Sequence, residues 1–303
     1  HNRRLQVHGE FRKRRMARLT ASINKLSNED LSKRAEQKRT KALLALISAT
    51  RSCDRGVELV KGTDSDSPAE AIEHFSKAVK LDPDYAYAYY SRAGAHDASG
   101  NSEKALADLN KAIGIDAHGA RFYLLRGDVR AAMDSDAEAL KDFGAALDLD
   151  PTLGEAYVNR AGLLARIDRT DDALADYSRA VELGQSRAAA LQGRARLLRE
   201  AGKSEDALAD LDRLISMPAG TSAAAHTLRG LVLADLGSWE DAVAAFTHAL
   251  DADATSVDAL ANRGKAMVKL GRDTEALRDL DAALERDPEH AGAAHARARL
   301  RRK

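Results

Sequence analysis

The stretch Ala105-Leu-Ala-Asp-Leu-Asn-Lys-Ala-Ile113 decides the fold, because the chain repeats it at a fixed interval. A first copy starts at Ala71, and related copies start at Ala139, Ala173, Ala207, Ala242 and Ala276. Successive copies are 34 residues apart, except for one step of 35. A constant period of this length is typical of solenoids, which present an extended surface rather than one enclosed site. The first expectation is therefore binding rather than chemistry.

Each copy is predicted to form a helical hairpin. In the copy from Thr152 to Gln185, residues 155–166 carry apolar side chains at helical spacing, and residues 171–183 form a second such segment. The apolar residues of the second segment form one wide stripe: Ala173, Leu174, Tyr177, Ala180 and Val181. Two short helices cannot bury such stripes alone, so neighbouring hairpins are expected to stack.

Glycine and proline mark the ends of the predicted helices. A glycine lies at the turn inside four of the copies: Gly100, Gly202, Gly237 and Gly271. Glycine tolerates the positive φ at which many helices end. A proline follows the second helix at Pro83, Pro151 and Pro288, where it stops one helix and can open the next.

These features resemble the tetratricopeptide repeat (TPR) family, whose pattern runs W-x2-L-G-x2-Y, then A-x3-F, then P. The small residue of the first helix is Gly56, Ala93, Gly127, Ala161, Ala195, Gly230 and Gly264. The A-x3-F element recurs as Ala71/Phe75, Ala105/Leu109, Ala139/Phe143, Ala173/Tyr177, Ala207/Leu211, Ala242/Phe246 and Ala276/Leu280. The resemblance covers about residues 50–288. It implies an all-α, right-handed superhelical solenoid of about seven TPR hairpins.

The chain is predicted to have three parts: a basic helical N-terminal extension over 1–49, seven repeats over 50–288, and a capping helix with a basic tail over 289–303. The formal net charge is zero, but the charges are segregated. Residues 1–50 hold 13 Lys and Arg against 4 Asp and Glu, whereas residues 51–303 hold 34 against 43. An acidic solenoid is therefore expected between two basic ends.

An arginine column is the most regular polar feature of the repeats. It consists of Arg55, Arg92, Arg126, Arg160, Arg194, Arg229 and Arg263. A column of aspartates accompanies it, at Asp108, Asp142, Asp176, Asp210 and Asp279. We expect pairing within single hairpins rather than a basic stripe for phosphate, because arginine suits bidentate, partly buried pairing. His74 and Ala245 interrupt the aspartate column, so the arginines of the first and sixth repeats should behave differently.

A partner-binding groove is expected along the first helices of the hairpins. The resemblance places these residues at inward positions: Tyr87, Tyr90, Leu124, Asp128, Val158, Asn159 and Asn262. Amphipathic aromatic side chains on a rigid surface suit peptide binding, so the N-terminal half is the expected main surface. Alternatively, Tyr87 and Tyr90 contact the N-terminal helices or a neighbouring subunit. Tyr89, Tyr123 and Tyr157 recur in register and are expected to pack internally.

A second candidate surface is the basic segment formed by Arg12, Lys13, Arg14, Arg15 and Arg18. It could meet nucleic acid, an anionic membrane surface or an acidic protein, or it could be a solvated or juxtamembrane segment. No stacking aromatic residues accompany these charges, which weakens the case for nucleic acid.

Nothing in the sequence predicts catalysis. The nine histidines show no metal-ligand spacing with Cys53, and no nucleophile elbow, phosphate loop or carboxylate pair stands out. We therefore expect no enzyme activity, catalytic residue, cofactor, metal or small-molecule substrate. A single cysteine suits a reducing intracellular compartment, cytoplasmic or an organelle matrix. The chain begins with His1 rather than Met, so residues upstream are expected, and a membrane tether there stays open.

The predicted function is a non-enzymatic scaffold that binds a protein segment or subunit in its groove. The alternatives are a nucleic-acid- or ribonucleoprotein-associated factor acting through its basic ends, and the cytosolic part of a membrane-tethered sensor or effector. Salt dependence separates the first two, because counterion release makes phosphate binding fall steeply with salt.

Overall fold

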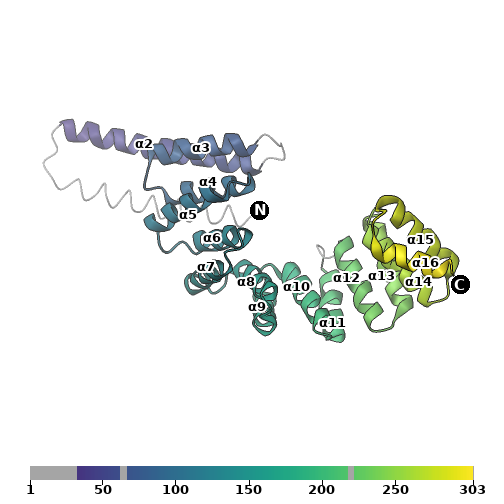
Figure 1. Cartoon of the computed structure of the whole chain (residues 1–303). Helices are drawn as coiled ribbons and strands as arrows, with labels where there is room; N and C mark the ends of the chain where they lie inside the picture. Colours follow the sequence, from purple (N-terminus) through teal and green to yellow (C-terminus); the bar gives the residue numbers. More distant parts are fainter. Residues whose placement is uncertain (1–32, 62–66, 218–221, 303) are drawn as a thin grey trace. The chain divides into compact units, whose positions relative to one another are not determined.

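The computed structural model describes residues 33–61, 67–217 and 222–302, and all regular secondary structure in these ranges is α-helical (Figure 1). The described residues belong to two compact units. The N-terminal unit contains 33–61 and 67–151, and the C-terminal unit contains 152–217 and 222–302. The predicted all-α fold class is confirmed. The basic segment from Arg12 to Arg18 lies outside the described residues.

In the N-terminal unit, three hairpins follow one another. Their helices are α2 (Lys33–Lys61), α3 (Ser67–Leu81), α4 (Ala86–Ala98), α5 (Ser102–Ile115), α6 (Ala120–Ala132) and α7 (Asp136–Leu149). Helix α2 is one continuous helix across residues 49 and 50, where the extension was expected to end and the first repeat to begin. The first helix of the first hairpin is therefore about twice as long as the others, which span about 13 residues each.

The C-terminal unit holds four hairpins and a final single helix. Its helices are α8 (Gly154–Arg166), α9 (Thr170–Leu183), α10 (Arg187–Glu200), α11 (Ser204–Ile215), α12 (Ala223–Asp235), α13 (Trp239–Ala252), α14 (Val257–Lys269), α15 (Asp273–Arg286) and α16 (Ala291–Leu300). Helix α16 lies where the sequence places a capping helix, and it packs on both α14 and α15.

The hairpins stack in the same way within each unit. Each second helix packs against its own first helix and the first helix of the next hairpin. First helices also contact the first helices before and after them, as α10 contacts α8 and α12. No two second helices make contacts as extensive as these with one another in either described unit. First helices therefore form a closely spaced layer, and one side of that layer faces away from the second helices.

Side-chain sizes are matched between the two helices in five of the hairpins; Ala161 with Tyr177 and Gly264 with Leu280 are the exceptions. A Cβ atom added to Gly56, Gly127 or Gly230 would lie 2.5–2.7 Å from the ring of Phe75, Phe143 or Phe246, respectively. Where the first helix carries Ala93 or Ala195 instead, the A-x3-F position holds Leu109 or Leu211. The large side chains of the matched pairs are all fully buried. The core is thus a row of small, complementary interfaces.

The four expected turn glycines have φ between 73° and 77°, which confirms that each first helix ends with a left-handed residue there. The equivalent positions of the third and fourth repeats hold Asp134 and Asp168, with φ of 55° and 59°. Aspartate tolerates this conformation better than most residues. The turn geometry is therefore kept where the glycine is missing.

Candidate protein-binding surface

Five arginines of the first helices are paired with aspartates 16 residues later in their own hairpins. In each pair Nε and Nη2 of the arginine donate to the two carboxylate oxygens at 2.6–2.9 Å. The pairs are Arg92–Asp108, Arg126–Asp142, Arg160–Asp176, Arg194–Asp210 and Arg263–Asp279, which we call the arginine ladder. The aspartates are buried, so the guanidinium satisfies a carboxylate that has left water. The predicted pairing is confirmed.

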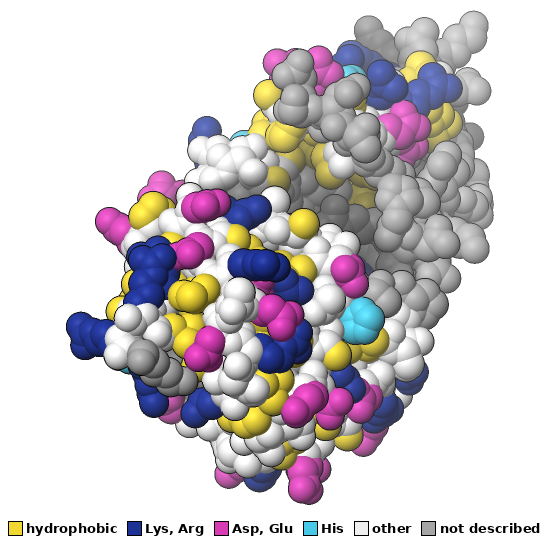
Figure 2. Space-filling view, turned by 90° about the vertical axis from the view of Figure 1, so that its right-hand side faces the viewer, with side chains coloured by type: hydrophobic (Ala, Val, Ile, Leu, Met, Phe, Trp, Pro, Cys, Tyr) yellow, Lys and Arg dark blue, Asp and Glu magenta, His cyan; other side chains and the backbone are white. Residues whose placement is uncertain are grey.

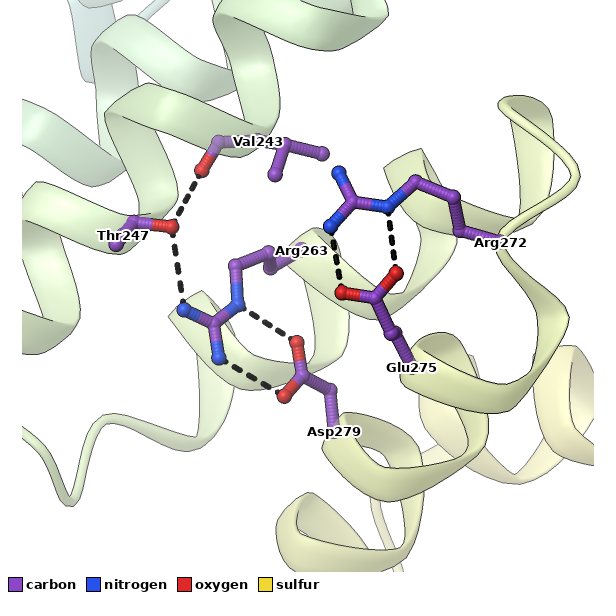
Figure 3. A network of polar contacts seen from close by, with 6 residues as sticks. All are labelled: Val243, Thr247, Arg263, Arg272, Glu275 and Asp279. Atoms are coloured by element: carbon purple, nitrogen blue, oxygen red, sulfur yellow. Dashed lines mark hydrogen bonds and ion pairs between the residues drawn. The ribbon is translucent and has the colours of Figure 1, made fainter.

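Four ladder arginines also bond to the preceding hairpin. Their Nη1 atoms donate to Ser76 Oγ, Asn110 Oδ1, Ser178 Oγ and Thr247 Oγ1, each 16 residues before the arginine, at 2.7–3.2 Å. Figure 3 shows Arg263 between Asp279 and Thr247, whose hydroxyl donates in turn to the Val243 carbonyl oxygen at 2.8 Å. Each of these arginines therefore joins three helices from two hairpins. Sequence reasoning missed this contact, although a polar residue recurs at that spacing.

The interrupted repeats differ as predicted. In the first repeat Arg55 Nη1 lies 3.4 Å from Glu58, and both side chains are exposed. In the sixth repeat Ala245 offers no carboxylate, and Arg229 Nε donates instead to Asp212 Oδ1 of the preceding hairpin. In α16, Arg297 likewise donates to Asp281, 16 residues earlier, at 3.0 Å.

The rings of Tyr89, Tyr123 and Tyr157 pack against three arginines of the ladder. The guanidinium carbons of Arg92, Arg126 and Arg160 are 5.4–5.7 Å from the centroids of their rings. At this distance the ring face attracts the cation, and the rings shield one side of each pair from water. The expectation that these three tyrosines have a packing role is confirmed.

Tyr85, which precedes α4, forms a contiguous ring cluster with Tyr87 and Tyr90 of α4 and Phe122 of α6. Ring centroids lie 6.4 Å apart for Tyr85 and Tyr87, 5.7 Å for Tyr87 and Tyr90, and 5.2 Å for Tyr90 and Phe122. Tyr87 and Leu124 are each only 4% exposed. This corrects the expectation that both side chains are exposed to a partner, because neighbouring rings and apolar side chains cover Tyr87 within the core beside α2 and α3.

The remaining predicted groove residues fall into two sets. Tyr90 and Asp128 are half-buried on α4 and α6 of the N-terminal unit. Val158 and Asn159 are half-buried on α8, and Asn262 lies on α14, both in the C-terminal unit. Asn262 Oδ1 accepts a hydrogen bond from Lys265 Nζ at 3.2 Å. The residues of each set therefore lie on first helices of a single unit.

In the C-terminal unit, the first helices carry a column at the register position that Asp128, a predicted groove residue, occupies on α6. It holds Arg196 on α10, Leu231 on α12, Lys265 on α14 and Arg299 on α16. This position is two residues after the first-helix arginine that bonds to a second helix, which is Arg194, Arg229, Arg263 or Arg297, and two residues turn an α-helix by about 200°. The column therefore lies on the side of the first helices away from the second helices. We call this side of α8, α10, α12, α14 and α16 the first-helix surface.

Arg196 lies beside the phenol of Tyr177, which reaches from α9 to the glycine position 193 of α10. A Cβ added to Gly193 would lie 2.5 Å from the Tyr177 ring, so this close approach requires glycine. Burial raises the pKa of Tyr177, and the neighbouring Arg196 partly offsets that rise. The phenol oxygen thus accepts a hydrogen bond from the surface cation Arg196.

Two negative findings apply to the described residues only. No group of three or more His, Cys, Asp or Glu side chains is arranged to hold a metal ion within residues 33–61, 67–217 and 222–302. No helix in the same ranges is both long and apolar enough to cross a membrane.

Comparisons with known proteins agree with the geometry of the hairpins. Family models described as "Tetratricopeptide repeat" match residues 193–257 and 86–118, and one described as "TPR repeat" matches residues 69–100. No curated protein matches the sequence significantly. The solved structures that match are similar to this chain in fold.

One similar structure is YrrB, described as a TPR protein with an unusual peptide-binding site; it is 23% identical, with 63% of this chain and 97% of that chain covered and a TM-score of 0.54. A TPR protein from Parabacteroides merdae is 17% identical over 84% of this chain and 99% of that chain, with a TM-score of 0.59. The type IV pilus biogenesis factor PilW is 18% identical, with 69% of this chain and 97% of that chain covered and a TM-score of 0.62.

Proposed function

Because the chain is a tetratricopeptide repeat protein, we propose that it is a non-enzymatic scaffold whose first-helix surface binds a segment or subunit of another protein. Proteins built from stacked hairpins use such extended surfaces for recognition. The peptide-binding site named for the similar YrrB supports the proposal.

The observation that carries this proposal is the contrast between the inside of the stack and the first-helix surface. Inside, the small residue, the A-x3-F element and the arginine ladder recur with few changes. On the surface, the column Arg196, Leu231, Lys265 and Arg299 changes chemistry between hairpins. Stacking does not require this variety, because the uniform interior already holds the hairpins together. A partner that runs across several hairpins would use it.

The proposal also covers activity and compartment. We expect no turnover from the purified chain, because its regular polar contacts serve stacking rather than a reaction. We also propose a reducing compartment, because a single cysteine in the sequence rules out an internal disulfide framework and suits such a compartment.

Site-specific photocrosslinking tests the proposed surface. A photoreactive residue would replace Gln192 or Thr227 on the first-helix surface, or exposed Arg213 on the second helix α11 as the control. We expect one protein to be captured from the first two positions and not from the third, and then to bind the purified chain. Capture of the same protein equally well from position 213 would contradict the assignment.

A further inference from the structure

The surface column of the C-terminal unit carries three cations around one apolar side chain. Arg196 and Arg299 are exposed, and Leu231 and Lys265 are half-buried. The four residues share one register position, with steps of 35, 34 and 34 residues. They therefore lie one hairpin apart, in the order cation, leucine, cation, cation.

These cations differ from the ladder arginines because their charge is not neutralised internally. Within the described residues, none of Arg196, Lys265 and Arg299 forms an ion pair. Arg196 lies beside a neutral phenol, and Lys265 donates to the neutral Asn262 amide. By contrast, Arg199 on the same helix as Arg196 is bonded to Asp235 at 2.5 Å.

Lys265 is held in a defined position. A Cβ atom at Gly292 of α16 would lie 2.7 Å from Lys265 Nζ, so the ammonium group lies directly against the backbone of the next first helix. The bond to Asn262 fixes it from the other side. An ammonium positioned in this way loses little side-chain freedom when it binds a carboxylate.

Acidic residues on these helices do not cancel the charge. Asp235 is bonded to Arg199, and Asp258 lies 3.5 Å from His290 at the start of α16. Glu200 at the end of α10 is exposed. Three cations without carboxylate partners face two carboxylates without a permanently charged partner, Glu200 and Asp258, so the surface keeps an excess of positive charge.

The pattern fits a polypeptide better than a nucleic acid. Leu231 interrupts the cations, and the neighbouring half-buried first-helix residues include Thr227 and Val268 rather than stacking aromatics. On the side of the molecule that carries α14 to α16, Lys and Arg side chains are interspersed with acidic and hydrophobic ones rather than gathered in one patch (Figure 2). Adjacent packed helices are about 8–10 Å apart, which an extended chain covers in about three residues.

We propose that the surface around Arg196, Leu231, Lys265 and Arg299 binds an extended acidic protein segment with the order acidic, apolar, acidic, acidic at intervals of about three residues. The inference rests on the proposed scaffold function and specifies the chemistry of the partner. The three carboxylates bind the three cations, and the apolar side chain contacts Leu231. Binding weakens as salt rises, because Arg196 and Arg299 are exposed.

The test uses the full chain and a fluorescein-labelled peptide, Glu-Ser-Ser-Leu-Ser-Ser-Glu-Ser-Ser-Glu, in anisotropy titrations. Two comparison peptides have Gln in place of each Glu, or Ser in place of Leu. A third comparison probe is a labelled oligonucleotide of ten thymidylates. We expect the acidic peptide to bind at least about tenfold more tightly than the Gln peptide. The Ser-for-Leu peptide should bind with intermediate affinity.

Matched variants locate the site. One variant combines Arg196→Gln, Lys265→Gln and Arg299→Gln. Its control combines Arg213→Gln, Arg278→Gln and Arg286→Gln, which remove the same charge from exposed positions on second helices. The first should lose at least about tenfold in affinity and the second less than about twofold. If the triple variant does not fold, the single variant Arg196→Gln replaces it in the titration, because Arg196 is exposed.

Three results would overturn the inference: equal binding of the acidic and Gln peptides, equal losses in the two triple variants, or oligothymidylate binding more tightly than the peptide at the same cations. The proposed function is judged separately. If crosslinking from positions 192 and 227 identifies a partner whose binding is unchanged in the first triple variant, the scaffold function stands and the acidic-segment inference falls.

Discussion

Arg229 on α12 donates from Nε to Asp212 Oδ1 on α11 at 2.7 Å, and so binds an aspartate of the preceding hairpin instead of one in its own. The five ladder arginines bind the aspartate of their own hairpin. Four of them meet a neutral hydroxyl or amide in the preceding hairpin, on the same side from which Asp212 approaches Arg229. In each arrangement the arginine has one aspartate, which comes from one of two helices.

The first prediction follows from this exchange of the aspartate partner between the arginine's own hairpin and the preceding hairpin. Asp212→Ser leaves Arg229 without a carboxylate and should destabilise the protein by about 0.5–1 kcal/mol, since the Asp212 side chain is about half exposed. Adding Ala245→Asp should restore most of this loss, because it recreates the arrangement of the fifth and seventh repeats. Urea denaturation of both single variants and the double variant measures the coupling.

The sign of the coupling decides the outcome. The Ala245→Asp substitution should be more favourable when Asp212 is absent, by about 0.5 kcal/mol or more, because the two carboxylates compete for one guanidinium. Strict additivity of the two single effects would show that the two carboxylates act independently and would contradict the exchange.

The second prediction concerns the buried ladder. Asp210→Asn should cost about 1.5–3 kcal/mol, the range for hydrogen bonds to charged groups, because Asp210 is 4% exposed and accepts both bonds from Arg194. Asp172→Asn is the control, since the Arg169–Asp172 pair is about half exposed and should contribute less than about 1 kcal/mol. Similar denaturation midpoints for the two variants would be inconsistent with a structural ladder.

The repeats and the pairing of each arginine with the aspartate of its hairpin could be predicted because both follow from a period in the sequence. A residue at a fixed register position meets the same neighbours in every repeat, so Arg126 and Asp142 are found together for the same reason as Arg194 and Asp210. The contact of Arg194 with Ser178 was missed because serine, asparagine and threonine share that register position without sharing a residue type.

The exposure of individual surface residues could not be predicted in this way. Tyr87 has the register of an inward-facing groove residue, yet the rings of Tyr85 and Tyr90 beside it exclude water. Such burial depends on non-repeating neighbours. Arg196 and Lys265 share the register of the predicted groove residue Asp128, but they become one set only when the first helices are seen as one layer.

The third prediction tests the matching of sizes within a hairpin. Gly230→Ala should destabilise the protein by about 1–3 kcal/mol, because the new methyl group would lie 2.5 Å from the Phe246 ring. The double variant Gly230→Ala with Phe246→Leu should be more stable than the sum of its single variants predicts, since it recreates the Ala195–Leu211 pair. No recovery in calorimetric unfolding would show that the glycine serves another purpose.

The fourth prediction concerns pH and the two histidines of the sixth repeat. The rings of His226 and His248 are 5.5 Å apart, and His248 Nδ1 lies 3.7 Å from Asp251. Burial, followed by the charges of His248 and Arg229, lowers the pKa of His226 below its ordinary value. The unfolded chain therefore takes up the proton first, so stability contributed by neutral His226 falls as the pH drops below about 6.5.

His226→Leu should remove this part of the pH dependence, because Leu191 and Leu260 occupy the same register position in buried form. Burial also lowers the pKa of His96, so a smaller slope of the same sign should remain in the variant. His248→Gln is the intermediate case, since it removes one cause of the shift and keeps the burial. Urea midpoints measured between pH 5 and pH 7.5 give the three slopes. We expect the slope to be steepest in the unmodified chain and shallowest in His226→Leu, and identical slopes would rule out His226 as the group that titrates.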